Sequence, residues 1–242
     1  MLRRRIHVLW GALFGAVAGA VIALRIRTPA PDRSQVLTAF FERLHLPWLA
    51  LDNTLKSHSQ LFLASIAGWV LFSLYWEAAA KNAAPAESSE SRASRGVHVF
   101  LVSLAQLLIF IPIRGLGRYV PLSFLIMAAG LAVQAMGTFL AVWARIHLGR
   151  NWSGKIAIKV EHQLIRSGPY RLLRHPIYTG LLAMYIGPAL VTGEWLAVLG
   201  VAMAALAYWR KIRLEEAALD AAFGADYDSY RRATWALVPG LY

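Results

Sequence analysis

The sequence contains no cysteine among its 242 residues, which excludes disulfide bonds, thiolate zinc sites and a cysteine nucleophile. Its seven histidines include no pair spaced four residues apart and no carboxylate cluster of the kind that binds metals. We therefore predict no metal site. Internal repeats are absent as well.

Acidic residues are scarce, because 13 Asp and Glu stand against 25 Lys and Arg, for a net charge of +12. Such an excess can indicate nucleic-acid binding, but its distribution argues otherwise. With the N-terminus in the cytoplasm and four crossings plus a hairpin, 18 of the 25 basic residues fall in cytoplasmic segments, which is the positive-inside bias of membrane proteins. We expect membrane lipids with anionic headgroups and an anionic ligand as partners, and no nucleic acid.

Hydrophobic residues are abundant, at 58% of the chain, where a soluble domain would have about half. Apolar stretches of membrane length lie at about 8–24, 61–80, 97–113 and 121–143. The first follows three arginines, and we expect an uncleaved signal anchor. The pattern predicts an all-α integral membrane protein with about four transmembrane helices, a C-terminal helical hairpin and a cytoplasmic tail.

The chain divides into two parts by composition. Residues 1–147 are predicted to be a transmembrane scaffold, with an outer loop at 25–60 and a polar, serine-rich cytoplasmic linker at 81–96. Residues 148–242 carry most of the unusual polar residues. We expect the chemistry to lie in this second part.

Residues 177–209 are almost wholly apolar but too long for one crossing, because a single helix would extend roughly 50 Å against a bilayer core of about 30 Å. Gly187, Pro188 and the run 192–194 indicate a helix stop, a turn and a new start. We predict a hairpin of two short helices at about 177–191 and 195–209. Both of its ends would then emerge on the same face of the membrane.

Two polar motifs flank this hairpin: the run 174–178 (Arg-His-Pro-Ile-Tyr) and the pair Glu215-Glu216. Polar residues so close to lipid indicate a functional site. Plainer readings exist for each motif. His175 alone could be a helix cap, and the two glutamates could form the solvated face of an amphipathic helix at 210–222. The hairpin geometry predicts that the two motifs meet.

The residues that follow carry a family resemblance. The runs 164–170 and 174–180, together with Glu215-Glu216, Phe223-Gly224, Tyr227 and Tyr230, are similar in order and spacing to the cofactor motif of the isoprenylcysteine carboxyl methyltransferase and phospholipid N-methyltransferase superfamily. The resemblance covers about residues 148–242. It implies a membrane-embedded enzyme that uses S-adenosylmethionine in a cytoplasm-facing pocket, with a lipophilic small-molecule or lipid substrate entering from the bilayer.

S-adenosylmethionine needs an acceptor for its ribose hydroxyls or amine and a donor for its carboxylate. Glu215 and Glu216 can supply the acceptor, and His175 or Arg174 the donor. The turn at Gly168 lets the backbone approach a ligand closely. The expected cofactor-binding residues are Gly168, Pro169, Tyr170, His175, Pro176, Tyr178, Glu215 and Glu216.

For catalysis, methyl transfer requires an aligned acceptor and the exclusion of water. A carboxylate acceptor needs no base but a cation to orient it, whereas an amine acceptor could lose a proton to Glu215 or Glu216. The expected catalytic residues are Arg174, Arg210, Arg213 and Glu216. The favoured acceptor is the carboxylate of an isoprenylcysteine-like molecule. The alternatives are a lipid amine N-methyltransferase, a sterol-type membrane reductase that uses NADPH, and a non-enzymatic membrane scaffold.

Overall fold

A computed structural model describes residues 53–81, 90–110, 117–120, 123–152 and 164–240 of the chain. Within these ranges the elements are α4 (Asn53–Ala80), α5 (Arg92–Phe110), α6 (Phe124–Leu148), η2 (Gly149–Asn151), η3 (Gly168–Arg171), α7 (Pro176–Thr192), α8 (Trp195–Phe223) and α9 (Ala225–Ala233). Four helices, α4, α5, α6 and α8, are long and apolar enough to cross a membrane, and no strand occurs in the described ranges. The prediction of an all-α integral membrane fold is confirmed.

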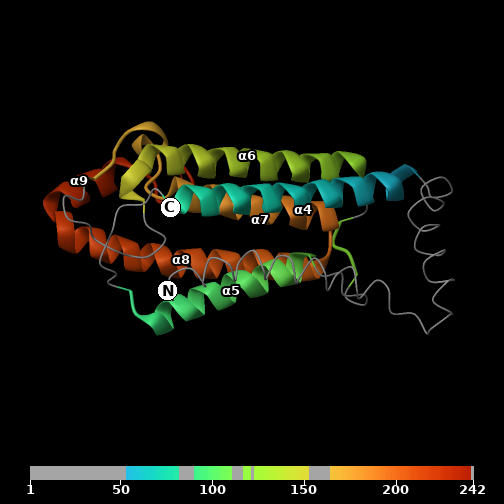
Figure 1. Cartoon of the computed structure of the whole chain (residues 1–242), viewed down its shortest axis with the longest axis horizontal. Helices are drawn as coiled ribbons and strands as arrows, with labels where there is room; N and C mark the ends of the chain where they lie inside the picture. The colour runs from blue at the N-terminus through green and yellow to red at the C-terminus, as the bar shows by residue number, and fades with distance from the viewer. Residues whose placement is uncertain (1–52, 82–89, 111–116, 121–122, 153–163, 241–242) are drawn as a thin grey trace.

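The helices form two layers, as Figure 1 shows. α4, α6 and α7 lie side by side in one layer, and α5 packs along α8 in the other. α7 and α8 contact each other and are joined by a short turn, so that the hairpin links the layers. α9 packs against α8 at the end of the bundle where α7 begins. The predicted hairpin therefore does bring both of its ends to one face.

The turn of the hairpin lies at Gly193, which ends α7 in the left-handed conformation with φ of 64°. Pro188 was expected to help stop the helix, but it lies inside α7. A proline has no N–H to donate to the carbonyl four residues earlier, which is that of Met184. The indole of Trp69 on α4 donates to this carbonyl at 3.2 Å instead. A neighbouring helix thus supplies the missing hydrogen bond, and α7 continues.

The second helix of the hairpin is longer than expected. We predicted a helix at 195–209, and an alternative reading had an amphipathic helix at 210–222, but α8 runs unbroken over 29 residues. No glycine, proline or capping residue interrupts the sequence between Tyr208 and Glu216, and most residues there favour helix. The change from apolar to amphipathic composition marks a change of surroundings rather than a helix end.

Other helix boundaries also differ from the sequence expectations. α4 begins at Asn53, inside the predicted outer loop, because no proline or glycine stops the helix there. α5 begins inside the predicted linker, where the Ser91 hydroxyl accepts the amide of Ser94 at 3.1 Å and caps the helix. α6 continues beyond the predicted span to Leu148. The predicted span 8–24, the loop residues 25–52 and the linker residues 82–89 lie outside the described residues.

Glycines let α6 and α7 pack with their backbones in contact. A Cβ added at Gly137 of α6 would lie 2.5 Å from the carbonyl oxygen of Gly180 on α7, and one added at Gly130 would lie 2.6 Å from that of Gly187. Small residues of this kind drive helix association in membranes, where lipid provides no hydrophobic force between helices. The close seam fixes the position of the α7 N-terminus, where the polar motif begins.

Candidate active site

Arg174 and His175 lie between η3 and α7, and the C-terminal segment holds their backbone. We call residues 234–238 the C-terminal strap. The amide of Arg174 donates to the Trp235 carbonyl at 2.8 Å, and that of His175 donates to the Ala236 carbonyl at 3.0 Å. Trp235 in turn donates to the Leu172 carbonyl at 3.0 Å. Two segments about sixty residues apart therefore fix the backbone that presents the Arg-His pair.

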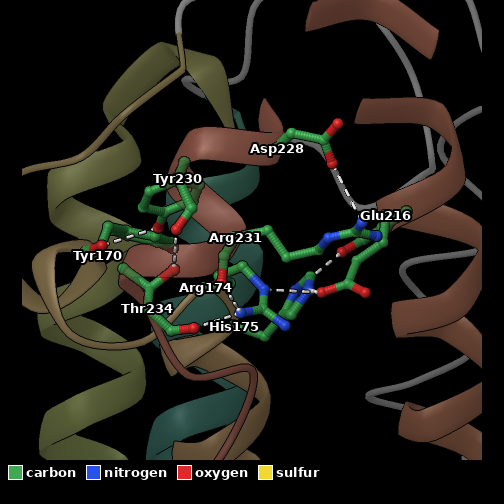
Figure 2. Close-up of polar contacts among 9 residues, drawn as sticks. Tyr170, Arg174, His175, Glu216, Asp228, Tyr230, Arg231 and Thr234 are labelled. Carbon is green, nitrogen blue, oxygen red and sulfur yellow. Dashed lines mark hydrogen bonds and ion pairs between the residues drawn. The ribbon is translucent and has the colours of Figure 1, made fainter. Parts of the chain in front are cut away.

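Glu216 of α8 joins both members of this pair, as Figure 2 shows. Its Oε1 accepts from Arg174 Nε at 2.9 Å and lies 3.3 Å from His175 Nε2. The Arg174 and Glu216 side chains are only 10% and 11% exposed. Arg174 Nη1 also donates to the carbonyls of Thr234 and Arg231. The guanidinium thus ties α8 to α9 and the strap.

Glu215 faces the same histidine from its other side. Its Oε2 lies 3.7 Å from His175 Nδ1, and its Oε1 accepts from the Tyr178 hydroxyl at 2.5 Å. Tyr178 stacks between His175 and Tyr208, with ring centroids 5.7 Å and 5.3 Å apart. The structure therefore brings together the two motifs predicted to meet and adds an aromatic wall to them.

These contacts bear on the plainer readings of His175 and the two glutamates. His175 does occupy the N-cap position of α7, but its side chain makes no capping hydrogen bond and its ring lies between two glutamates. The side chains of Glu215 and Glu216 are 22% and 11% exposed, so they do not form a solvated face. Burying two carboxylates costs free energy unless partners compensate, as the arginine and histidine do here.

Three buried tyrosines surround the cluster, and burial raises the pKa of each hydroxyl. The pKa of Tyr230 rises to about 12, and its hydroxyl donates to the Tyr170 carbonyl at 2.7 Å. Burial, with the charge of Glu215 added, raises the pKa of Tyr170, while Arg145 opposes this effect. Burial and the nearby Glu216 carboxylate raise the pKa of Tyr227. All three hydroxyls stay protonated as donors near neutral pH.

The Tyr227 hydroxyl is buried and has no hydrogen-bond partner of standard geometry. Such an unsatisfied group is uncommon in a folded protein. It lies at the cluster, because the charges of both Glu216 and Arg174 act on it. It is therefore a donor that a polar ligand could satisfy.

The remaining predicted site residues lie around the cluster or away from it. Pro169, Tyr170 and Pro176 are buried beside it, and Pro176 is the first residue of α7. The close backbone approach at Gly168, with φ of 58°, is to the ring of His147, 2.2 Å from an added Cβ. Arg210 donates to the Ser94 hydroxyl of α5 at 2.9 Å, and Arg213 is exposed on α8. The structure does not bring the two last arginines into the cluster.

Sequence analysis did not single out Arg145, a buried arginine of α6 that is 4% exposed. It donates to the carbonyls of Ala79 at 2.6 Å and Gly149 at 2.8 Å, at the ends of α4 and α6, and its Cζ lies 4.2 Å from the Trp152 ring centroid. Its Nε is buried without a partner. A charged residue three positions before the end of α6 was the available signal, but its partner Ala79 is distant in sequence.

The site therefore belongs to a helical membrane protein with a buried carboxylate, histidine and arginine cluster at one end. A family model described as phospholipid methyltransferase matches residues 125–226. Protein-S-isoprenylcysteine O-methyltransferase of Schizosaccharomyces pombe is 28% identical over 117 residues, 46% of this chain and 48% of that protein. The B enzyme of Arabidopsis thaliana with that name is 29% identical over 113 residues, 46% of this chain and 57% of that protein. The chain thus spans about half the length of these curated relatives.

A relative with a different name matches a shorter segment. Methanethiol S-methyltransferase 2 of Bradyrhizobium diazoefficiens is 41% identical over 75 residues, 30% of this chain and 27% of that protein. The fold is also similar to a solved structure of the eukaryotic intramembrane Ras methyltransferase ICMT, with a TM-score of 0.59, 18% identity, and coverage of 96% of this chain and 86% of that one. The family-model match over residues 125–226 and the named relatives support a place in the superfamily that includes the phospholipid and isoprenylcysteine methyltransferases.

Proposed function

We propose that the chain is a membrane-embedded methyltransferase that moves a methyl group from S-adenosylmethionine to the carboxylate of a lipophilic, isoprenylcysteine-like acceptor. The observation that carries the proposal is the buried cluster of His175, Glu215 and Glu216. It lies within the segment that matches the phospholipid methyltransferase family model. Because most basic residues are expected on one side of the membrane, we place the site on the cytoplasmic side.

The residues at the cluster fit S-adenosylmethionine. Glu215 Oε2 is available to accept from ribose hydroxyls or the ammonium group, because the Tyr178 hydroxyl donates to Oε1 and His175 Nδ1 lies 3.7 Å from Oε2, beyond hydrogen-bond distance. The buried Tyr227 hydroxyl, which interacts with the Glu216 carboxylate without a hydrogen bond of standard geometry, can donate to a ligand. The first amides of α7, at residues 177 and 178, have no helical partner, and a helix N-terminus suits a carboxylate. Gly168, Pro169, Tyr170 and Pro176 form the adjoining wall.

When bound, the cofactor supplies an electrophilic methyl group on a sulfonium cation. Arg174 and Glu216 fix the positions of α8 and His175 through their mutual ion pair. The carboxylate acceptor requires no general base. The task of these residues is therefore to align the acceptor with the methyl group and to exclude water. Arg210, between α8 and α5, and Arg213 are the candidates to orient that carboxylate.

The depth of the cluster suits an acceptor that enters from lipid. Trp195 begins α8 and is exposed, as expected for an aromatic residue at a membrane boundary. A bilayer core of about 30 Å corresponds to about 20 helical residues. Twenty residues beyond Trp195 is Glu215. The carboxylates therefore lie near the opposite boundary, where an apolar chain can stay in the bilayer while its polar end reaches the site.

Calorimetric titration of S-adenosylhomocysteine into the detergent-purified protein tests the proposal. The key variant is Glu215→Gln, which keeps the size of the side chain and an acceptor for Tyr178 but removes the charge. Trp195→Phe, at the opposite end of α8, is the matched control. We expect saturable binding to the wild type and the control, weakened at least tenfold in Glu215→Gln. Folded wild-type protein that fails to bind would refute the cofactor assignment.

A second acceptor class has a specific observation in its favour. The relative that is 41% identical over 75 residues is named for methyl transfer to methanethiol, so a thiol is the alternative acceptor. Wild-type protein with labelled S-adenosylmethionine can be offered a farnesylcysteine, a small thiol and a phosphatidylethanolamine in parallel. Methylation of the farnesylcysteine carboxylate supports the first proposal. Methylation of the thiol alone would replace it.

A further inference from the structure

Three exposed apolar side chains lie on the strap and on the segment that it pairs with. Leu172 is 54% exposed, Trp235 43% and Val238 44%. Single exposed apolar residues are ordinary, but Leu172 and Trp235 are joined by one backbone hydrogen bond, from the Trp235 amide to the Leu172 carbonyl, and Val238 follows on the same strap. They lie directly outside the backbone of Arg174 and His175. An environment that accepts apolar groups is therefore expected next to the cluster.

Basic residues flank this apolar group. Arg171 precedes Leu172, Arg232 lies three residues before Trp235, and both are exposed. Neither has a carboxylate partner within the described ranges of the chain. Arg231 differs, because its Nη2 lies 3.1 Å from Asp228 Oδ1 and its charge is compensated. A tryptophan with two uncompensated arginines matches the chemistry of an anionic membrane surface.

The position of the group along the membrane agrees with this chemistry. α7 ends at Thr192, next to the turn at Gly193, and about 20 helical residues span the bilayer core. α7 supplies 17 such residues, and its first residue, Pro176, lies four residues after Leu172. A count of twenty residues along α8 from Trp195 arrives at Glu215, which contacts His175 directly before α7, so the membrane boundary lies near the level of the cluster. The strap therefore lies where lipid headgroups begin.

We propose that the strap, with Leu172, Arg171 and Arg232, is a docking surface for the anionic headgroups of the bilayer, and that its occupancy stabilises the Arg174–His175 backbone. Trp235 inserts at the boundary and the two arginines contact the phosphates. The headgroups bind the same strap that accepts the amides of Arg174 and His175. Anionic lipid then favours the closed strap by linkage. Membrane charge would in this way set the geometry of the neighbouring site.

Hydrogen exchange of the full chain in lipid nanodiscs tests the surface without reference to methyl transfer. The amides of Arg174, His175 and Trp235 report opening of the strap, since each donates across the pairing. We expect slower exchange in phosphatidylcholine mixed with phosphatidylglycerol than in phosphatidylcholine alone. The effect should be about fivefold for each arginine, the factor equivalent to ~1 kcal/mol. About 1 M salt, with a Debye length near 3 Å, should abolish it.

Paired variants make the outcome decisive. Arg171→Gln with Arg232→Gln should remove the lipid effect, while Arg118→Gln, exposed at the opposite end of the bundle, should retain it. Trp235→Ala should speed exchange in both lipids. Equal exchange of the wild type in the two lipids, or a lipid effect that survives in the double variant, would overturn the proposal. Cofactor affinity in the two nanodiscs is a further readout that rests on the proposed function, whereas the exchange result does not.

Discussion

Each end of the helical bundle has one isolated backbone bridge, but the two ends are built from different residues. At one end, residue 173 pairs with residue 235, and at the other, residue 118 pairs with residue 194. The first end buries Arg174, His175 and Glu216 in mutual contact. The second end has Tyr119 packed on Trp195 and a half-buried Glu194. Closure of the bundle therefore does not require buried charge.

The difference supports the proposed assignment of function to the first end. Burial raises the pKa of Glu194 and the charge of Arg118 opposes this, but Glu194 keeps access to water. At the other end, charges are held in surroundings where each depends on the others. Stability alone would not favour such a cluster, because well-packed apolar residues stabilise as much or more. Its presence is better explained by a ligand.

The difference between the two ends is tested most directly by removing one glutamate from each end. Glu216→Ala leaves the Arg174 guanidinium buried without its carboxylate and should lower the free energy of unfolding by about 3–5 kcal/mol. Glu194→Ala removes a group in contact with water and should cost about 0–1 kcal/mol. Denaturant unfolding in detergent measures both. Equal losses would contradict the distinction, and Arg174→Met with Glu216→Met should recover most of the stability.

The sequence predicted the meeting of the two motifs correctly because it depends on local signals. Gly193 and the polar residues beside it mark the turn, and the apolar runs on either side set its ends. The continuity of α7 through Pro188 depends on Trp69, which is more than a hundred residues away in sequence. Arg145 is similar, because its partners at Ala79 and Gly149 meet only after α4 packs on α6. Long-range partners of this kind leave no periodic signal in the chain.

The buried tyrosines at the first end should make the free energy of unfolding depend on pH. The unfolded chain ionises tyrosine near pH 10, while Tyr230 in the folded protein ionises at about 12. The raised pKa of Tyr230 therefore stabilises the folded protein by roughly 2–3 kcal/mol. This contribution is complete below pH 10 and is lost as the pH rises through 12. Tyr230→Phe should be less stable than the wild type at neutral pH, because the bond to the Tyr170 carbonyl is lost, and should approach it at pH 12. Unfolding from pH 8 to 12 measures this. A gap that stays constant over that range would refute the assignment.

Two glycines with positive φ, Gly168 and Gly193, offer a matched test between the ends. Alanine at either position costs about 1–2 kcal/mol of backbone strain. At Gly193 the new Cβ also lies 2.9 Å from the Val120 carbonyl oxygen, whereas at Gly168 it meets only the His147 ring. Adding His147→Ala to Gly168→Ala should relieve the steric clash and recover the stability lost to it. The backbone strain should remain. Thermal unfolding of the single and double variants measures this difference, and full recovery would mean that strain is absent.

The smallest effect separates stability from function at the two ends. Thr179 Oγ1 donates to the Leu237 carbonyl of the strap at 2.7 Å, and the Tyr119 hydroxyl donates to the Ala189 carbonyl at 2.9 Å. Thr179→Val and Tyr119→Phe each remove one such bond with little change of shape, so each should cost about 0.5–1.5 kcal/mol. Only Thr179→Val loosens the strap beside His175, so only this variant should weaken S-adenosylhomocysteine binding, measured by calorimetry. If both variants bind as the wild type does while losing equal stability, the strap stabilises the fold without positioning the site.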